Sequence, residues 1–157
     1  AFFRQGLRSP RYVAAPMVDQ SELPYRLLMR RSGCDLCYTP MYHACDFAGA
    51  GEAELPRLGF ATCDEDRPLV VQFCAKDPDD FLEAARMVQD RCDAVDLNLG
   101  CPQPKALKGG WGAALMDEEN WHVAYAIVRK ASAALRVPVT CKIRIFADVR
   151  KTVRFAR

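Results

Sequence analysis

One cysteine in this sequence stands in an unusual setting for a thiol. Cys101 lies between Gly100 and Pro102, directly after an apolar segment that has the composition of a strand. Glycine permits a sharp turn and proline cannot continue a strand ladder, so the sulfur is predicted to stand out at the strand end. The Asn98-x-x-Cys101 spacing favours a functional thiol there over the alternative, a small buried apolar residue.

Two further polar residues interrupt apolar segments. Lys142 lies inside a strand-like run, where an unpaired ammonium is costly to bury, so it needs an anionic partner. That partner is either Asp96 in a structural salt bridge, or a cofactor phosphate or anionic ring. Gln72 follows two valines and poses the same question, because a hydrogen bond in the core would satisfy its amide as well as a ligand would.

Other candidate motifs are weaker. Cys34-x-x-Cys37 has metal-ligand spacing, but no second pair follows at the spacing of a zinc finger. His43 and His122 have no partner at metal or triad spacing, so no metal is expected. The run 109–112 (Gly-Gly-Trp-Gly) is not a dinucleotide fingerprint, and it is predicted to form a flexible loop beside Cys101.

The elements that must position these residues alternate along the chain. Apolar and β-branched runs predict strands, and stretches of helical period with acidic or hydroxyl start signals predict helices. The predicted strands cover residues 12–15, 36–39, 69–73, 94–98 and 139–145, and the predicted helices cover 21–32, 78–90 and 117–135, with another after 148. This order predicts a parallel sheet with helices outside, whose ligands bind at the carboxyl ends of the strands. The stretch 40–68 is predicted to be a long functional or mobile loop with one or two short helices.

The composition is that of a globular protein. Half of the residues are apolar and 27% are charged, and no apolar run reaches the ~18 residues of a membrane helix. Eight scattered cysteines indicate reduced thiols, so we expect an intracellular protein, cytoplasmic or nuclear, without a membrane partner. Residues 97–157 hold 11 basic and 4 acidic side chains, which fits either a face toward an anionic partner or ordinary solvated surface.

Six motifs in order resemble those of the tRNA-dihydrouridine synthases. They are Ala-Pro-Met-Val (15–18), Tyr-Thr-Pro-Met (38–41), Val-Gln-Phe (71–73), Asp-Leu-Asn-Leu-Gly-Cys-Pro-Gln (96–103), Gly-Ala-x-Leu-Met (112–116) and Cys-Lys-Ile-Arg (141–144). The runs 18–23 and 66–69 look closest to the eukaryotic branch that acts on positions 16 and 17 of the D-loop. The branch acting on 20a and 20b shares the run 34–41, so the family assignment is firmer than the branch.

This resemblance implies a TIM (β/α)8 barrel that binds FMN at its C-terminal mouth. NADPH or NADH would re-reduce the flavin. The resemblance assigns one acid and five cofactor contacts. Cys101 would be the general acid that protonates C5 of uracil after hydride reaches C6. The residues expected to contact FMN are Pro16, Met17, Val18, Gln72 and Lys142, the last beside the anionic edge of the ring.

The implied substrate is tRNA. Asn98 would position the uracil, and Arg144, in the last motif, is also expected to bind substrate. A stacked uracil must leave its place to reach the mouth, and Trp111 is expected either to stack on a base or to cover apolar surface, with Tyr42 a second aromatic candidate. Lys105 and Lys108 are candidates for phosphate contacts.

Five predicted strands are fewer than the eight of a complete barrel of roughly 250 residues. We therefore expect residues 1–10 to be a leading segment and residues 11–157 to be the N-terminal portion of the catalytic barrel, without its later strands and without the RNA-binding helical domain. Two alternatives stay open: a flavin barrel acting on a free pyrimidine or another small molecule, and a non-catalytic fragment that binds RNA or a protein without flavin.

Overall fold

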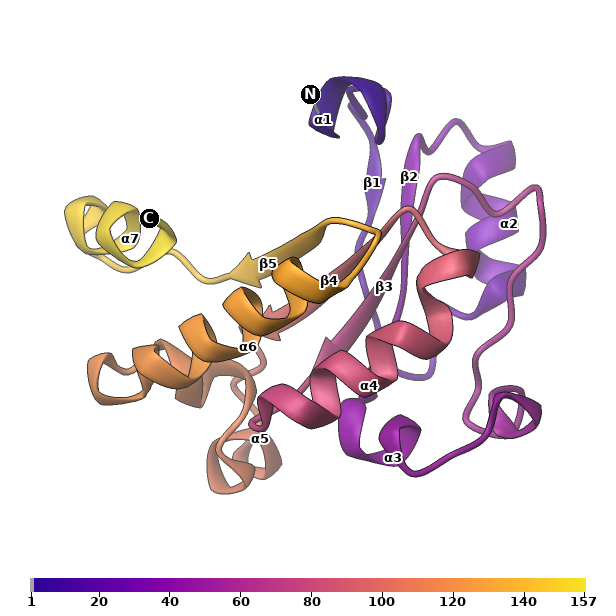
Figure 1. The fold of residues 1–157 in the computed structure, drawn as a ribbon. Helices are drawn as coiled ribbons and strands as arrows, with labels where there is room; N and C mark the ends of the chain where they lie inside the picture. Colours follow the sequence, from indigo (N-terminus) through magenta and orange to yellow (C-terminus); the bar gives the residue numbers. More distant parts are fainter. Residues whose placement is uncertain (1) are drawn as a thin grey trace.

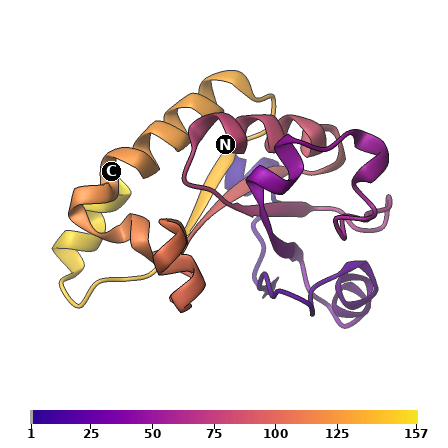
Figure 2. The ribbon, with the colours of Figure 1, turned by 90° about the horizontal axis from the view of Figure 1, so that it is seen from below.

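A single curled sheet organises the protein, which we describe from a computed structural model covering residues 2–157. Its strands are β1 (Val13–Ala14), β2 (Leu36–His43), β3 (Leu69–Cys74), β4 (Ala94–Leu99) and β5 (Val139–Ile143). They lie in sequence order and every neighbouring pair is parallel. Figure 1 and Figure 2 show the sheet curling with helices on its outer side. The prediction of a parallel α/β fold that forms the first five strands of a TIM barrel is confirmed.

Helices connect the strands near the predicted places. They are α1 (Phe2–Gln5), α2 (Leu23–Arg31), α3 (Ala44–Ala48), α4 (Pro78–Val88), α5 (Pro104–Gly109), α6 (Trp121–Ala134) and α7 (Val149–Ala156). Short 3-10 turns span Glu52–Glu54, Gln89–Arg91, Gly112–Met116 and Glu118–Asn120. Within residues 2–157, no helix has both the length and the apolar character needed to cross a membrane.

The predicted helices 21–32, 78–90 and 117–135 have acidic or hydroxyl residues at their starts, and only the start of the second forms a side-chain cap. The Asp77 carboxylate accepts hydrogen bonds from the N–H groups of Asp79 (2.7 Å) and Asp80 (3.3 Å) at the start of α4. The start of α2, by contrast, has no side-chain cap from Glu22. The Ser21 hydroxyl does not cap the helix either, because it is hydrogen-bonded to the Met17 main chain. The acidic residues 117–119 enter a 3-10 turn, so α6 begins only at Trp121.

The two faces of the sheet bury different side chains. Alternate residues of a strand point to opposite faces, and Phe73, Val95 and Leu97 are fully buried on the outer face, in a cluster with residues of α3, α4 and α6. Burial of a large apolar side chain stabilises the fold by about 1.5–3 kcal/mol. The inner face carries the buried polar residues Gln72, Asp96 and Asn98, and the candidate site lies around them.

The segment 40–68 packs in part against the core of the sheet. Its first residues extend β2 to His43, and α3 follows at once. Leu55 is completely buried and Phe60 nearly so, and both belong to the outer core cluster. The expected short helices are present, and apolar side chains of the segment fill the core. That the segment is functional or mobile stays a prediction.

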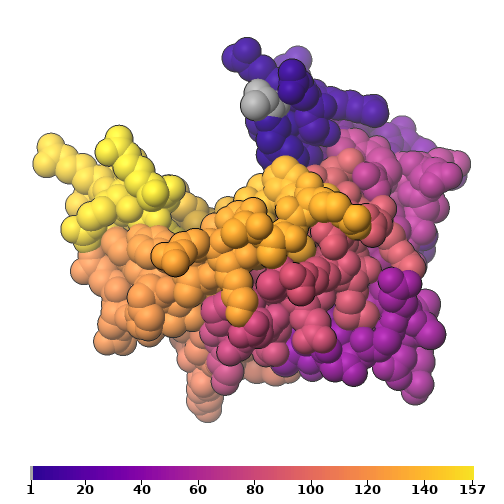
Figure 3. Space-filling view, viewed as in Figure 1, coloured from indigo at the N-terminus to yellow at the C-terminus, as the bar shows by residue number. Residues whose placement is uncertain are grey.

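The N-terminal segment packs against the inner face at the amino ends of the strands. Leu7, Leu36, Val70 and Ala94 form a small buried cluster, with Phe2 against it. Figure 3 shows this segment and α7 projecting from the same side of the molecule with an open space between them. The inner face is therefore apolar at its amino end and polar toward its carboxyl end.

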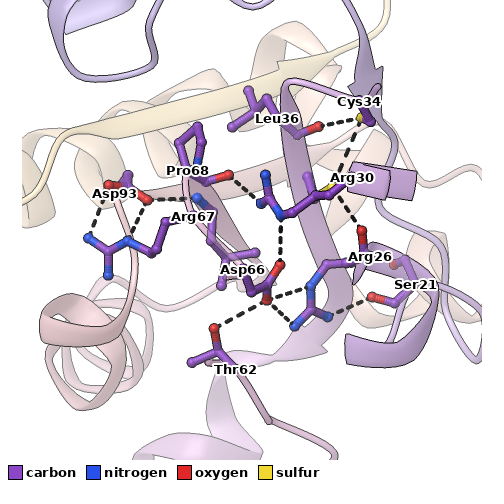
Figure 4. A network of polar contacts seen from close by, with 12 residues as sticks. Ser21, Arg26, Arg30, Cys34, Leu36, Thr62, Asp66, Arg67, Pro68 and Asp93 are labelled. Atoms are coloured by element: carbon purple, nitrogen blue, oxygen red, sulfur yellow. Dashed lines mark hydrogen bonds and ion pairs between the residues drawn. The ribbon is translucent and has the colours of Figure 1, made fainter. Parts of the chain in front are cut away.

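A buried ion-pair network fixes α2 to the segment before β3 (Figure 4). The Asp66 carboxylate is fully buried, and its Oδ2 accepts from Nε (2.9 Å) and an Nη (2.7 Å) of Arg26, whose side chain is 1% exposed. Asp66 Oδ1 lies 3.3 Å from Nε of Arg30, and the Thr62 hydroxyl donates to Oδ2. A buried carboxylate is tolerated only when it is paired and hydrogen-bonded, as this one is.

The network reaches the loop after β1. Arg26 also donates to the Ser21 carbonyl (2.7 Å), and the Ser21 hydroxyl accepts from the Met17 N–H (2.9 Å) and donates to the Met17 carbonyl (3.0 Å). The main chain of Met17 is thereby held on both sides by one buried side chain. The ion pair thus sets the course of the 16–21 loop at the carboxyl edge of the sheet.

Replacing Asp66 with Asn should destabilise the protein by about 3–5 kcal/mol, because it leaves two guanidinium groups without their buried carboxylate. The free energy of unfolding from urea titration measures this loss. Asp90→Asn is the matched control, since Asp90 and its partner Arg136 are 75% and 69% exposed and such pairs contribute at most about 1 kcal/mol. Equal losses in the two variants would contradict the assigned role of the network.

Candidate functional site

Polar side chains from three neighbouring strands meet on the inner face of the sheet. The register aligns Gln72 of β3 with Asp96 of β4, and Asp96 with Thr140 of β5. Asn98 and Lys142 are also aligned, and they lie two residues further along their strands, on the same face as Asp96 and Thr140. The sequence prediction that Gln72, Asn98 and Lys142 converge at one end of the sheet agrees with this placement.

Hydrogen bonds link these side chains into a chain. Thr140 Oγ1 donates to Asp96 Oδ1 (2.6 Å), and Gln72 Nε2 donates to Asp96 Oδ2 (2.8 Å). Asn98 Nδ2 in turn donates to Gln72 Oε1 (2.9 Å). Gln72 is fully buried, Asp96 is 1% exposed and Asn98 is 9% exposed, so the polar groups are satisfied by one another away from solvent.

The series of hydrogen bonds ends at the backbone of Cys101, the candidate acid. Asn98 Oδ1 accepts from the N–H of Gly100 (3.0 Å) and from the N–H of Cys101 (2.9 Å). The Cys101 carbonyl accepts from the N–H of Ala113 (3.0 Å). Both polar groups of the Cys101 backbone are therefore held, and the turn after β4 is fixed in place while the residue stays partly exposed.

A glycine makes the approach of the second loop possible. Gly112 has φ +63°, and a Cβ there would lie 2.9 Å from the Cys101 carbonyl oxygen and 3.1 Å from its Cβ. Only a residue without a side chain adopts this backbone at this distance without strain. Gly112 is thus a site residue that sequence reasoning missed.

The surroundings of Cys101 on the inner face are apolar. Cys74, Ala106 and Trp111 form a buried cluster there, with Met41 and Cys101 packed against it. Burial raises the pKa of the Cys74 thiol to about 12, so Cys74 stays protonated at neutral pH. Its sulfur lies 3.4 Å from Nδ1 of His43, and the side chain lines the apolar surroundings of Cys101.

The expectation of a flexible loop carrying Trp111 at its tip is wrong. Residues 104–109 form α5, and Trp111 is only 7% exposed, because its ring packs edge-on against His43 with centroids 4.7 Å apart. Of its two expected roles, covering apolar surface describes its position. Tyr42, the other aromatic candidate, lies in the outer core cluster.

The cationic residues of β5 and the turn after it are exposed. In the described part of the chain Lys142 forms no ion pair, and the salt bridge to Asp96 left open by the sequence is not formed. Asp96 instead accepts from Gln72 and Thr140. Arg144 Nε donates to the Gly100 carbonyl (2.6 Å), which places its guanidinium against the turn that carries Cys101.

The three predicted loop contacts lie after β1 at the same edge. Pro16 and Met17 are partly exposed and Val18 is 53% exposed. The main chain of Met17 is fixed by Ser21, as described above. A bound ring could thus pack on ordered backbone here, although the contacts themselves stay a prediction.

The core hydrogen bond that the sequence left open for Gln72 is present. Both amide atoms of Gln72 have protein partners, and its main-chain N–H donates to Thr39 Oγ1 (3.1 Å). Contact between Gln72 and the edge of a flavin ring stays a prediction.

The paired cysteines show no metal-site geometry. Cys34 Sγ and Cys37 Sγ are 4.0 Å apart as free thiols, and burial raises the pKa of Cys37 to about 12. Over residues 2–157 no three His, Cys, Asp or Glu side chains are placed to hold a metal ion.

Sequence reasoning missed the centre of the polar chain. It weighed Asp96 only as a salt-bridge partner of Lys142 and did not weigh Thr140. The usable signal was spacing, because Asp96 lies two residues before Asn98, and Thr140 two residues before Lys142, so that each pair shares a face of a strand.

Gly112→Ala should destabilise the protein by about 1–2 kcal/mol from the backbone conformation alone, with a further loss from its contact with Cys101. Thermal or urea unfolding measures both losses together. Gly33→Ala separates them, since Gly33 has φ +92° but open space around its Cβ position. A Gly112 variant no less stable than the Gly33 variant would show that the close approach is not needed.

Stability should depend on Asp96 between pH 4 and 6. Burial raises the pKa of Asp96 from 3.8 to about 6, against the opposing effects of hydrogen bonds from Thr140 and Gln72 and of the Lys142 charge. Since the folded protein binds this proton more tightly than the unfolded chain, the contribution is full below pH 4 and is lost as the pH rises through 6, by roughly 3 kcal/mol. The difference in unfolding free energy between the parent and Asp96→Asn should change over this range; a constant difference would contradict the assignment.

Comparison with known proteins gives the family that the sequence motifs resemble, over most of the chain. The family model described as Dihydrouridine synthase (Dus) matches residues 13–157. The tRNA-dihydrouridine(16/17) synthase of Schizosaccharomyces pombe, whose name also specifies NAD(P)(+), is 47% identical over 99% of this chain and 38% of its own length. A Rattus norvegicus protein described as like that enzyme is 52% identical over 99% of this chain and 35% of its own.

A second group of relatives is more distant. The tRNA-dihydrouridine(20a/20b) synthase-like protein of Homo sapiens is 40% identical over 90% of this chain and 44% of its own length. The chain spans 35% and 38% of the two 16/17-type relatives above. With the family model matched from β1 onward and relatives of 47–52% identity across the chain, the protein belongs to the dihydrouridine synthase family.

Proposed function

We propose that this chain forms the cofactor- and uracil-facing part of an FMN-dependent tRNA-dihydrouridine synthase. The reaction is reduction of the C5–C6 double bond of uridine in the tRNA D-loop, with NADPH or NADH as the electron source. The observation that carries the proposal is the hydrogen-bonded row of Gln72 and Asn98 that ends on the backbone of Cys101, with Lys142 on the same face of the sheet. Family membership and the names of the relatives support it.

The residues present fit a flavin at the carboxyl edge. The Lys142 ammonium is exposed and without an ion pair in the described chain, so it is available to an anionic ring edge. Pro16, Met17 and Val18 offer main chain for a ring to pack on, and the Met17 main chain is held by Ser21, whose carbonyl accepts from Arg26. FMN, when bound, supplies the hydride for C6 of uracil, and a cation near its ring favours the reduced form.

Cys101 is the proposed general acid. As C6 gains a hydride, negative charge develops toward C5, and a thiol beside C5 can give up its proton there. The Asn98 amide has one N–H left after its bond to Gln72, which is available to orient the uracil. The apolar neighbours Cys74 and Trp111 limit water around the sulfur.

Substrate contacts are proposed for exposed basic residues near the turn. The Arg144 guanidinium lies against Gly100, and Lys105 and Lys108 are exposed on α5, which follows Cys101 directly. Cations so placed can neutralise tRNA phosphates. Stacking of a base on Trp111 would require its ring to leave His43, so the turnover of Trp111→Ala at fixed flavin content tests that role.

Positions 16 and 17 are the proposed targets. Relatives named for these positions are 47–52% identical to the chain, whereas those named for 20a and 20b are 37–40% identical. Mass spectrometry of tRNA from cells lacking the gene tests the assignment, because dihydrouridine should then be missing at 16 and 17 only. An intracellular location, cytoplasmic or nuclear, stays a prediction.

Cys101→Ala should abolish dihydrouridine formation in tRNA while the protein keeps its bound FMN, because the substitution removes the acid and leaves every backbone contact in place. Mass spectrometry of the tRNA product and the visible absorbance of the flavin measure the two effects. The parent protein should oxidise NADPH faster with tRNA than with free uracil. Retained product in the variant would refute the acid, preference for free uracil would favour a small-molecule enzyme, and folded protein without flavin would favour a non-catalytic role.

A further inference from the structure

The buried carboxylate of Asp96 takes no part in the reaction as proposed, yet it lies at the centre of the polar chain. We infer that Asp96 is a positioning residue for Cys101, acting through Gln72 and Asn98 on the main chain of the turn. The inference rests on the proposed function for its catalytic meaning, but its structural content concerns only residues of this chain.

The orientation of each amide follows from its neighbour. An ionised carboxylate can only accept hydrogen bonds, so Asp96 Oδ2 requires the N–H group of Gln72, 2.8 Å away. Gln72 Oε1 then faces Asn98 and requires its Nδ2, at 2.9 Å. A reversed amide at either position would place donor against donor or acceptor against acceptor in a buried site, where an unmade hydrogen bond is costly.

The last link places the turn. With Nδ2 committed to Gln72, Asn98 Oδ1 must face the N–H groups of Gly100 and Cys101, at 3.0 and 2.9 Å. These two bonds set where the chain leaves β4 and therefore where the Cys101 side chain begins. Asp96 thus decides, through two hydrogen bonds, which way the Asn98 amide points, and the Cys101 N–H is one hydrogen bond further along.

The role depends on an acceptor at Oδ2 and not on charge. A protonated Asp96 can donate from Oδ1 to Thr140 and still accept from Gln72 at Oδ2. The amide of Asp96→Asn can do the same, with its nitrogen toward Thr140, 2.6 Å from the present Oδ1. Asp96→Ala has no acceptor, so the Gln72 amide is free to turn and the order is lost along the chain.

Amide hydrogen exchange of the protein, followed residue by residue by NMR, tests the inference without flavin or tRNA. The Cys101 N–H should exchange about tenfold faster in Asp96→Ala than in the parent, and within about threefold of the parent in Asp96→Asn. Thr140→Val is the matched control: it removes a hydrogen bond to the same carboxylate on the side away from Cys101, and should leave the exchange of Cys101 near the parent rate.

Three results would overturn the inference. They are unchanged exchange at Cys101 in Asp96→Ala, exchange as fast in Asp96→Asn as in Asp96→Ala, and equal acceleration in Thr140→Val, which would indicate general loosening. If Asp96→Ala does not fold, Gln72→Met breaks the next link and should give the same tenfold acceleration; parent-like exchange in that variant would also overturn the inference.

Turnover then separates this inference from the proposed function. With FMN, NADPH and tRNA, kcat should fall at least about tenfold in Asp96→Ala and recover in Asp96→Asn. KM for tRNA should change little, because Asp96 acts on the acid and on the orientation of the uracil, and not on the phosphate contacts proposed to bind tRNA. If the parent protein makes no dihydrouridine, the proposed function is contradicted. The hydrogen-exchange rates of Cys101 still test the role of Asp96 in that case. A loss confined to KM would contradict the positioning role.

Discussion

The central polar groups of the site, on Gln72, Asp96 and Asn98, are buried on one face of a parallel sheet. Such groups persist only when they are hydrogen-bonded. The two-residue period of the strands sends Phe73, Val95 and Leu97 outward to the helices and turns Gln72 and Asp96 inward. The parallel register then brings the inward residues side by side, where amide, carboxylate and hydroxyl satisfy each other. Loss of register by one residue would exchange the two faces, so the core and the site depend on the same alignment.

Much of this arrangement can be predicted from the sequence. Strand-like runs alternating with helical segments are sufficient to predict a parallel sheet, and the carboxyl ends of parallel strands share one edge. These two features alone predict that Gln72, Asn98 and Lys142 lie near Cys101. The residues that carry this prediction interrupt apolar runs, and a polar interruption in a strand is visible in a single sequence.

The remaining features depend on contacts between distant segments. Arg26 sits on a helix and Asp66 in a loop 40 residues later, and nothing in the spacing shows that they form a buried pair. Trp111 follows two glycines, which are typical of an exposed loop. In the structure its ring is nevertheless buried, because it packs against His43. The Ser21 hydroxyl can hydrogen-bond either to the N-terminus of α2 or to the Met17 main chain. The conformation of the folded loop determines that it bonds to Met17.

The turn after β4 holds position 101 by its peptide nitrogen and carbonyl oxygen. These atoms are common to almost all amino acids, proline alone lacking the N–H. The hydrogen bonds of the turn consequently do not select the side chain that is presented at this point. Architecture and reactivity at position 101 can therefore diverge independently in evolution, and descendants of this fold can inherit the one without the other.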